Sequence, residues 1–166
     1  MQQPVRAYIG IGSNLDGPVA RVRQAFHALA EIPACRRLAQ SPLYLSAPVG
    51  GPPDQPDYIN AVAALDTTLA PKNLLAALQA LEEAQGRVRT ERWGPRTLDL
   101  DLLLYDRRVS DDPALTLPHP RLHERAFVLY PLYDIAPDLD IPGRGPLVEL
   151  VARCPARAIA RLDSAD

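Results

Sequence analysis

A row of alternating leucines in the second half of the chain constrains the fold most strongly. Leucine occupies positions 98, 100, 102 and 104, and Asp99 and Asp101 stand between the first three of them. A period of two is typical of a β-strand, in which successive side chains point to opposite faces. We therefore expect a strand over 98–105 that presents Asp99 and Asp101 together on one face.

Two carboxylates in this arrangement indicate a charged ligand. In a strand the Cα atoms of Asp99 and Asp101 would lie roughly 6.5–7 Å apart, and like charges this close repel unless a cation sits between them. Carboxylate oxygens are hard ligands, so Mg²⁺ shared with phosphate oxygens is the expected partner. The alternative is an edge strand protected by inward-pointing charges, and this short pattern alone does not separate the two.

The segment immediately upstream favours the metal interpretation. Four arginines and a tryptophan fall within 86–96, namely Arg87, Arg89, Arg92, Trp93 and Arg96. Guanidinium groups bind phosphate oxygens in a planar, bidentate manner. A loop that is only solvated would need neither the tryptophan nor the Gly-Pro that follows it. We therefore expect an anionic ligand that carries phosphate next to the aspartate strand.

Other phosphate and metal motifs are excluded. The single lysine, Lys72, does not follow a glycine loop, so a Walker-type phosphate loop is absent from the sequence. The segment 10–15 lacks the third glycine of a dinucleotide-binding fingerprint, and we predict a strand-to-helix turn there with Ser13 or Asn14 as the helix cap. His119 and His123 are four residues apart, but the proline at 120 opposes a helix that carries both as zinc ligands.

Length and composition indicate one compact enzyme domain over 1–166. Of the 166 residues, 47% are hydrophobic, which is ample for a single core. The net charge of −2 argues against nonspecific nucleic-acid binding, so the arginine cluster is local and suits a small polyanion. The sequence shows neither a signal peptide nor a long apolar segment, and its two cysteines lack metal or redox spacing. We expect a cytoplasmic monomer without membrane contact.

The predicted elements follow an α+β order. Strands are expected near 5–11, 38–46, 58–66 and 98–105, helices near 18–31 and 71–85, and further helices around 124–135 and 146–153. The order β-α-β-β-α-β predicts a ferredoxin-like core with a mainly antiparallel sheet and helices packed on it.

Four ordered blocks of sequence carry a family resemblance. They span 7–15, 54–60, 91–101 and 117–120, and the third reads Glu-Arg-Trp-Gly-Pro-Arg-Thr-Leu-Asp-Leu-Asp. With these blocks the chain resembles the 6-hydroxymethyl-7,8-dihydropterin pyrophosphokinases of folate biosynthesis over nearly its whole length. The resemblance implies transfer of pyrophosphate from ATP to the pterin hydroxymethyl group, with two Mg²⁺ ions and release of AMP.

The resemblance also assigns roles to residues of this chain. The metals would be held by Asp99 and Asp101, and the catalytic residues would be Arg87, Trp93, Arg96 and His119. The nucleotide would be bound by Gln79, Glu82, Arg87, Arg96, His119 and Arg125. The pterin would be bound by Pro48, Val49, Gly50, Tyr58, Asn60 and Phe127. No general base is obvious in the sequence.

Two other classes of protein stay open at this stage. A ferredoxin-like module with arginines and aromatic residues can bind single-stranded RNA, although its aromatic strand motif is missing here. Another Mg²⁺-dependent phosphotransferase on the same fold would show the same aspartate strand and arginines. The pterin set of Tyr58, Asn60 and Phe127 separates the pyrophosphokinase from both.

Overall fold

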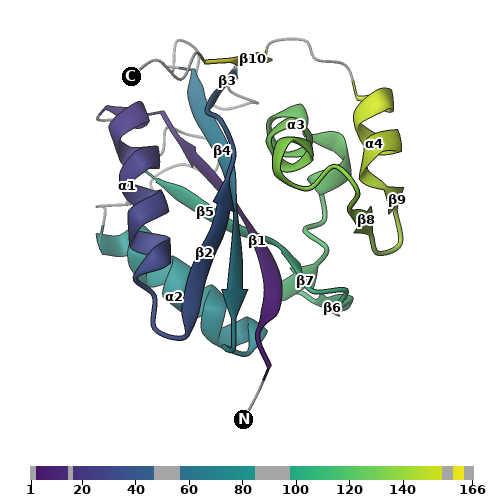
Figure 1. Cartoon of the computed structure of the whole chain (residues 1–166). Coiled ribbons are helices and arrows are strands. Elements are labelled where there is room, and N and C mark those ends of the chain that lie inside the picture. The colour runs from purple at the N-terminus through teal and green to yellow at the C-terminus, as the bar shows by residue number, and fades with distance from the viewer. Residues whose placement is uncertain (1–2, 15–16, 47–56, 85–97, 155–158, 163–166) are drawn as a thin grey trace.

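The fold is built on one large antiparallel sheet with helices on both faces (Figure 1). The computed structural model describes residues 3–14, 17–46, 57–84, 98–154 and 159–162. The first half of the chain contains β1 (Val5–Ser13), α1 (Pro18–Ala30), β2 (Cys35–Gln40), β3 (Tyr44–Ser46), β4 (Tyr58–Thr67), α2 (Pro71–Ala84) and β5 (Asp99–Tyr105). It is followed by β6 (Ser110–Asp112), β7 (Leu115–Leu117), the short 3-10 helix η1 (Leu122–Glu124), α3 (Ala126–Ile135), β8 (Asp140–Ile141), β9 (Gly145–Pro146), α4 (Leu147–Arg153) and β10 (Ile159–Arg161).

The strand order confirms the predicted ferredoxin-like core. The main sheet runs β10-β3-β4-β1-β5, and β2 also pairs with β4. Every strand pairing in the described part of the chain is antiparallel. With β2 and β3 counted as one broken strand, the chain follows β-α-β-β-α-β, and β1 and β4 lie at the centre of the sheet.

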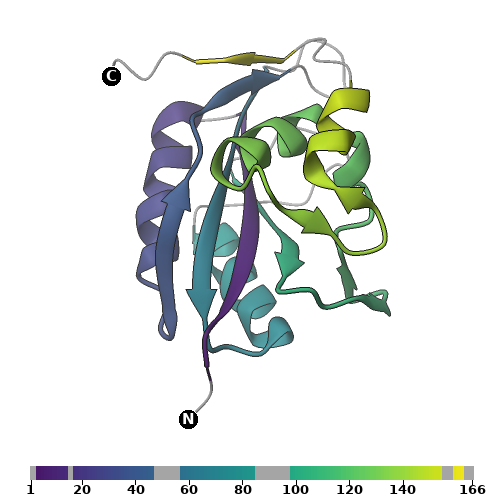
Figure 2. The same cartoon turned by 45° about the vertical axis from the view of Figure 1, so that its right-hand side comes forward.

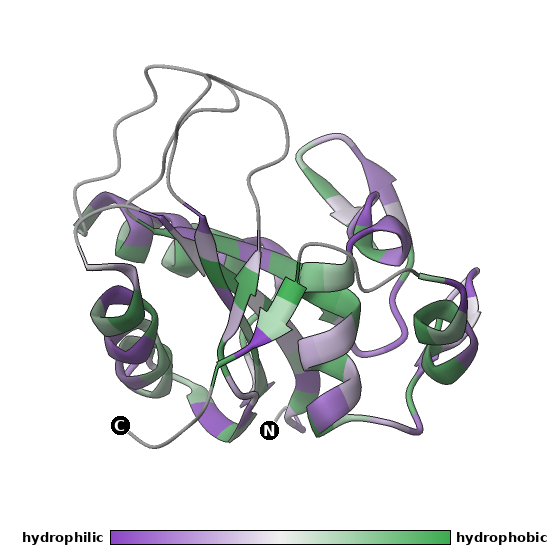
Figure 3. Cartoon of the chain, turned by 90° about the horizontal axis from the view of Figure 1, so that it is seen from above, coloured by the Kyte–Doolittle hydropathy of each residue, from purple (hydrophilic) through white to green (hydrophobic). Residues whose placement is uncertain are grey.

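The helices form one layer on each side of this sheet. α1 and α2 cover one face, whereas α3 and α4 cover the other (Figures 1 and 2). A view from above shows the sheet passing between helices that carry both hydrophilic and hydrophobic colours, as amphipathic helices do (Figure 3). Because both faces are covered, β4 is buried along almost its whole length.

Alternation along β4 assigns each of its residues to one of the two cores. Ile59 and Leu65 pack with α1 and α2, in the same core as Phe26 and Leu78. Val62 packs in the other core, which is formed with α3 and α4. Even-numbered positions of β4 therefore face α3 and α4.

The prediction of one strand over 38–46 is wrong, because the chain forms β2 and β3 with a break at Ser41-Pro42. Proline has no amide hydrogen and cannot donate to a sheet. The Ser41 amide donates to the Val62 carbonyl at 2.9 Å, and the Val62 amide donates to Ser41 Oγ at 2.9 Å. The serine side chain thus replaces a backbone acceptor, and both strands still pair with β4.

The predicted turn at 10–15 with a Ser13 or Asn14 cap is also wrong. β1 continues through Ser13, and both Ser13 and Asn14 are buried. α1 begins at Pro18 after Gly17, whose φ of 73° lies in the left-handed region and which makes no side-chain cap. The glycines at 10 and 12 continue the strand because β4 and β5 flank β1 on both sides there.

The helices predicted at the C-terminal end are confirmed as α3 and α4, with Pro131 inside α3. The hairpins β6-β7 and β8-β9 and the edge strand β10 are additional elements. No helix in the described ranges combines the length and apolar character needed to cross a membrane.

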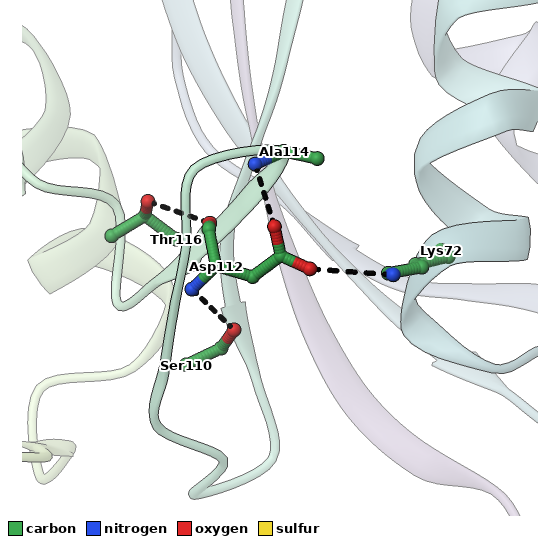
Figure 4. A network of polar contacts seen from close by, with 5 residues as sticks. All are labelled: Lys72, Ser110, Asp112, Ala114 and Thr116. Carbon is green, nitrogen blue, oxygen red and sulfur yellow. Dashed lines mark hydrogen bonds and ion pairs between the residues drawn. The ribbon is translucent and has the colours of Figure 1, made fainter.

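The only lysine of the sequence ties α2 to the β6-β7 hairpin (Figure 4). Lys72 Nζ lies 3.3 Å from Asp112 Oδ2, and the Ala114 amide donates to Asp112 Oδ1 at 2.9 Å. These contacts hold the pKa of Asp112 below its usual range, the Ala114 bond being the larger cause. Within the hairpin, Thr116 Oγ1 donates to the Asp112 carbonyl at 3.1 Å. The network fixes the hairpin whose second strand leads directly to His119.

Candidate active site

Four residues on four neighbouring strands form one row across the sheet. Tyr44 pairs with Asn60, Asn60 pairs with Gly12, and Gly12 pairs with Asp99. Directly opposite residues of antiparallel strands point to the same face, and this face is the one toward α3 and α4, since Val62 two positions along β4 packs there. The row therefore brings the predicted pterin residue Asn60 and the predicted metal residue Asp99 to one face, with only Gly12 between them.

Gly12 places no side chain between Asn60 and Asp99 in this row. A Cβ atom at this position would lie 3.1 Å from Asn60 Nδ2 and 3.7 Å from Tyr58 Cδ1. The first distance is shorter than ordinary van der Waals contact, so any larger residue would push against the asparagine amide. The absence of a side chain on Gly12 therefore lets the Asn60 amide lie close against β1.

The orientation of the Asn60 amide is fixed by β3. Ser46 Oγ donates to Asn60 Oδ1 at 2.5 Å, and both residues are buried. Because the amide oxygen accepts from Ser46, the Nδ2 hydrogens are the groups that Asn60 turns toward Gly12. Asn60 can therefore donate to acceptor atoms on the edge of a ligand.

A second contact from β3 reaches α3. Tyr44 donates a hydrogen bond through its hydroxyl to Asp134 Oδ2 on α3. Burial raises the pKa of Tyr44, and the bond to Asp134 raises it further, so the hydroxyl keeps its proton. The contact attaches α3, which carries Phe127, to the strand beside Asn60.

The start of α3 brings two predicted site residues together. The Arg125 guanidinium lies 5.4 Å from the centroid of the Phe127 ring, which is within cation–π distance. The Arg125 carbonyl accepts the Leu129 amide at 2.9 Å as the helix begins. The predicted nucleotide residue Arg125 and the predicted pterin residue Phe127 are therefore neighbours.

His119 is attached to β5 and held in one tautomer. Its amide donates to the Leu103 carbonyl at 2.9 Å, and the Arg121 amide donates to its Nδ1 at 3.3 Å. With Nδ1 accepting, the ring hydrogen lies on Nε2. Burial, reinforced by the positive charges of Arg125 and Arg121, lowers the pKa of His119 to about 4. At neutral pH His119 is an uncharged ring that donates through Nε2.

Asp99 and Asp101 have the chemistry of a shared Mg²⁺ site. Both are half-buried and alternate to the same face of β5. Within the described ranges, no three His, Cys, Asp or Glu residues gather closely enough to hold a metal alone. Mg²⁺ is usually held by one or two carboxylates together with substrate phosphates. Two carboxylates on one face of β5 therefore fit a metal that arrives with a nucleotide.

A protein-family model matches most of the chain. The model for 7,8-dihydro-6-hydroxymethylpterin-pyrophosphokinase (HPPK) matches residues 8–137. The chain belongs to the HPPK family. The prediction of a pyrophosphokinase of folate biosynthesis on a ferredoxin-like fold is therefore confirmed.

Two curated proteins are similar in sequence along nearly the whole chain. Pseudomonas aeruginosa 2-amino-4-hydroxy-6-hydroxymethyldihydropteridine pyrophosphokinase is 54% identical over 160 residues, which cover 96% of this chain and 98% of that protein. The Haemophilus influenzae protein of the same name is 47% identical over 147 residues, with 89% and 91% covered. Among solved structures, wild-type Plasmodium falciparum HPPK-DHPS with pterin and p-hydroxybenzoate superposes with a TM-score of 0.71 at 13% identity. That match covers 92% of this chain but 43% of the longer structure, and it supports the fold alone.

The remaining HPPK-type predictions fall on α2 or outside the described residues. On α2, Gln79 is exposed, whereas Glu82 is buried and its Oε2 accepts the Leu100 amide at 2.7 Å. Their role at the nucleotide stays a prediction. Six predicted residues lie outside the described part of the chain, namely Pro48, Val49, Gly50, Arg87, Trp93 and Arg96.

Sequence reasoning missed two residues that lie next to Asn60 in the candidate site, Gly12 and Ser46. Gly12 was assigned to a turn, although glycines at 10 and 12 stand two apart, which is the spacing of one strand face. Ser46 has no local signal, because its role depends on pairing of β3 with β4. Both residues act on Asn60, one by leaving space and the other by orienting the amide.

Proposed function

We propose that this chain transfers pyrophosphate from ATP to the hydroxymethyl group of 6-hydroxymethyl-7,8-dihydropterin, with Mg²⁺ held by Asp99 and Asp101. Membership of the HPPK family gives the reaction class. The observation that carries the assignment of residues is the row Asn60–Gly12–Asp99, which places an amide donor and a carboxylate on one face with only a glycine between them.

The pterin is proposed to lie over Gly12. A pterin is a flat ring edged with donors and acceptors, so it suits an oriented amide and aromatic surfaces. Asn60 would donate to the ring edge, with Tyr58 from β4 and Phe127 from α3 as the aromatic partners. Two strand spacings, about 9.5–10 Å, separate the Asn60 and Asp99 backbones, which leaves room for the ring with its hydroxymethyl group toward Asp99.

The phosphates are proposed to lie between β5 and the start of α3. Mg²⁺, when bound, supplies positive charge that reduces repulsion at the phosphorus under attack. Asp99 and Asp101 would hold the metal, two ions by the family resemblance, while His119 would donate from Nε2 to a phosphate oxygen. Arg125 would add positive charge beside Phe127. The catalytic roles of Arg87, Trp93 and Arg96, the nucleotide contact of Gln79, and the pterin contacts of 48–50 belong to the same proposal.

The reaction step involves one bond formed and one broken. The pterin hydroxymethyl oxygen bonds to the β-phosphorus of ATP, and the bond from that phosphorus to the oxygen bridging the α- and β-phosphates breaks. AMP leaves with that oxygen, and the hydroxyl proton is released. Because the chain itself contributes no covalent intermediate, positioning and charge would supply most of the catalysis.

We further propose that the chain acts as a monomer built from one domain. Helices cover both faces of the sheet. The large exposed hydrophobic side chains in the described part are Val109 and Val148, which lie on the β5-β6 turn and on α4. Sedimentation velocity should give one species of 18.2 kDa, and a stable dimer would contradict this proposal.

An AMP-release assay tests the function. Wild-type protein with ATP, Mg²⁺ and the pterin should release AMP, and omission of the pterin or an Asp99→Ala substitution should abolish that release. Asp111→Ala, an exposed aspartate on β6, is the matched control and should leave the rate unchanged. Production of ADP would favour another phosphotransferase. Tight binding of single-stranded RNA without nucleotide turnover would favour the RNA-binding module.

A further inference from the structure

Glu82 lies on the buried side of α2, where the spacing of the leucines predicts an apolar residue. It follows Leu74 and Leu78 at four-residue steps, and all three are buried. Residues four apart form one stripe along a helix, and α2 packs against β5. Burial of a carboxylate is unfavourable unless its oxygens find polar partners. The contacts of Glu82 must therefore explain its presence in this stripe.

One of these contacts is made to the backbone of β5. Glu82 Oε2 accepts the Leu100 amide at 2.7 Å. This distance is at the short end of the usual range for an N–H···O hydrogen bond. Leu100 is the residue between Asp99 and Asp101, so the bond is made at the centre of the predicted metal segment.

The hydrogen bond between Glu82 and Leu100 matters because β5 is the last strand in the sheet order. β5 ends the sheet order, with β1 as its neighbour in the described sheet. Alternate residues of an antiparallel strand direct their amides to opposite sides, and the bond to Glu82 identifies the Leu100 amide as one directed away from β1. The segment that carries both aspartates is thus held by β1 on one side and by Glu82 on the other.

Glu82 approaches β5 from the face opposite the aspartates. The Leu100 side chain belongs to the core shared with α1 and α2, whereas Asp99 and Asp101 alternate to the other face. Glu82 does not join them in a three-residue metal cluster within the described ranges. Its influence on a bound metal would therefore pass through the strand backbone.

We propose that Glu82 is a positioning residue that sets the geometry with which Asp99 and Asp101 hold Mg²⁺ and ATP. Glu82 fixes the Leu100 amide. This bond would prevent β5 from shifting or twisting when a cation attracts the carboxylates of Asp99 and Asp101. This inference rests on the proposed metal role of the two aspartates. In this proposal Glu82 does not contact the nucleotide directly and acts on the two aspartates through the backbone of β5.

Two substitutions separate these roles. Glu82→Gln keeps the size of the side chain and an oxygen acceptor for the Leu100 amide, whereas Glu82→Leu removes the acceptor but completes the apolar stripe of α2. The readouts are kcat, KM for ATP, binding of Mn²⁺ with α,β-methylene ATP by electron paramagnetic resonance, and hydrogen exchange of the Leu100 amide. Glu83→Gln, the exposed neighbour on the same helix, is the matched control.

We expect Glu82→Leu to fold and to bind Mn²⁺ about 10–100-fold more weakly, the usual effect of losing a group that orients metal ligands. Its kcat should fall while pterin affinity stays the same, and its Leu100 amide should exchange faster. Glu82→Gln should restore most of the Mn²⁺ affinity and kcat. Wild-type Mn²⁺ affinity in a folded Glu82→Leu protein would overturn the proposal.

Equal loss of nucleotide binding in both variants, with Leu100 exchange unchanged, would also overturn it and would favour direct contact. A failure of the proposed function gives a different result. If the wild-type protein released no AMP but Glu82→Leu still weakened Mn²⁺ binding and Glu82→Gln restored it, the positioning role would stand and the reaction would need reassignment.

Discussion

Gly12 lies opposite Asn60 so closely that a methyl group on its Cα would come within 3.1 Å of Asn60 Nδ2. Asn60 has little freedom to move away, because Ser46 holds its amide oxygen from the β3 side. The position of the Asn60 amide in the proposed pterin site therefore depends on a glycine at position 12.

We expect Gly12→Ala to weaken pterin binding about tenfold or more, since the new methyl group displaces the Asn60 amide and fills the space for the ring. ATP affinity should change much less. Isothermal titration with each ligand measures both effects. Gly10→Ala is the comparison, because its methyl group would meet the flexible end of the Leu103 side chain at 3.3 Å. A larger loss of pterin binding in Gly10→Ala than in Gly12→Ala would contradict this account.

Ser46→Ala should reduce both stability and pterin affinity. The change leaves the buried Asn60 Oδ1 without its Ser46 donor, at a cost of about 1–3 kcal/mol in unfolding free energy. Denaturant unfolding measures the first effect and pterin titration the second. In a double-mutant cycle with Asn60→Ala, the two losses should not add, because both changes remove the same bond. Additive losses in pterin affinity would show that Ser46 does not act through Asn60.

Asp101→Ala should abolish turnover without unfolding the protein. Removal of one of two like charges on the same face of β5 relieves repulsion, so the melting temperature should not fall. The rate of AMP release should drop at least about a hundredfold, since the proposed Mg²⁺ loses one of its two carboxylates. Asp111→Ala serves as the control for general effects of charge. An Asp101→Ala protein that is unfolded would instead indicate a structural role for this carboxylate.

The sequence was sufficient to predict the strand that carries the aspartates, because alternation is a local property. The leucines at 98, 100, 102 and 104 predicted β5 within one residue of its observed start. The apolar spacing of 71–85 likewise predicted α2. The predictions of β5 and α2 depend only on the spacing of apolar residues, which is two positions in a strand and three to four in a helix.

The arrangement of the site was not predictable from the sequence, because it depends on pairing between distant residues. Asn60 and Asp99 are 39 positions apart in number, and both register with Gly12 only because β4 and β5 flank β1. Local reasoning assigned the segment around Gly12 to a turn for the same reason. The break at Ser41-Pro42 is different, because proline within a predicted strand is a local signal against a continuous strand and the prediction over 38–46 did not take it into account.

The pH dependence of His119 follows from its lowered pKa of about 4. The folded state keeps the ring neutral, whereas the unfolded chain protonates it below about pH 6.5. The unfolded state therefore binds more protons between these values, and the contribution of His119 to stability is lost as the pH falls from about 6.5 toward 4. Above pH 6.5 the contribution is complete, and the ring remains the Nε2 donor that we propose for the phosphates.

Nitrogen-15 NMR of His119 checks the midpoint and the tautomer together. The ring should titrate near 4 and should carry its hydrogen on Nε2 at neutral pH, because the Arg121 amide occupies Nδ1. Arg125→Ala should raise this midpoint, since it removes a positive charge that disfavours the imidazolium. Arg107→Ala removes an exposed arginine paired with Asp140 instead and should leave the midpoint unchanged. A His119 midpoint near 6.5 in the wild-type protein would mean that the ring is solvated and that the phosphates meet a cation at mildly acidic pH.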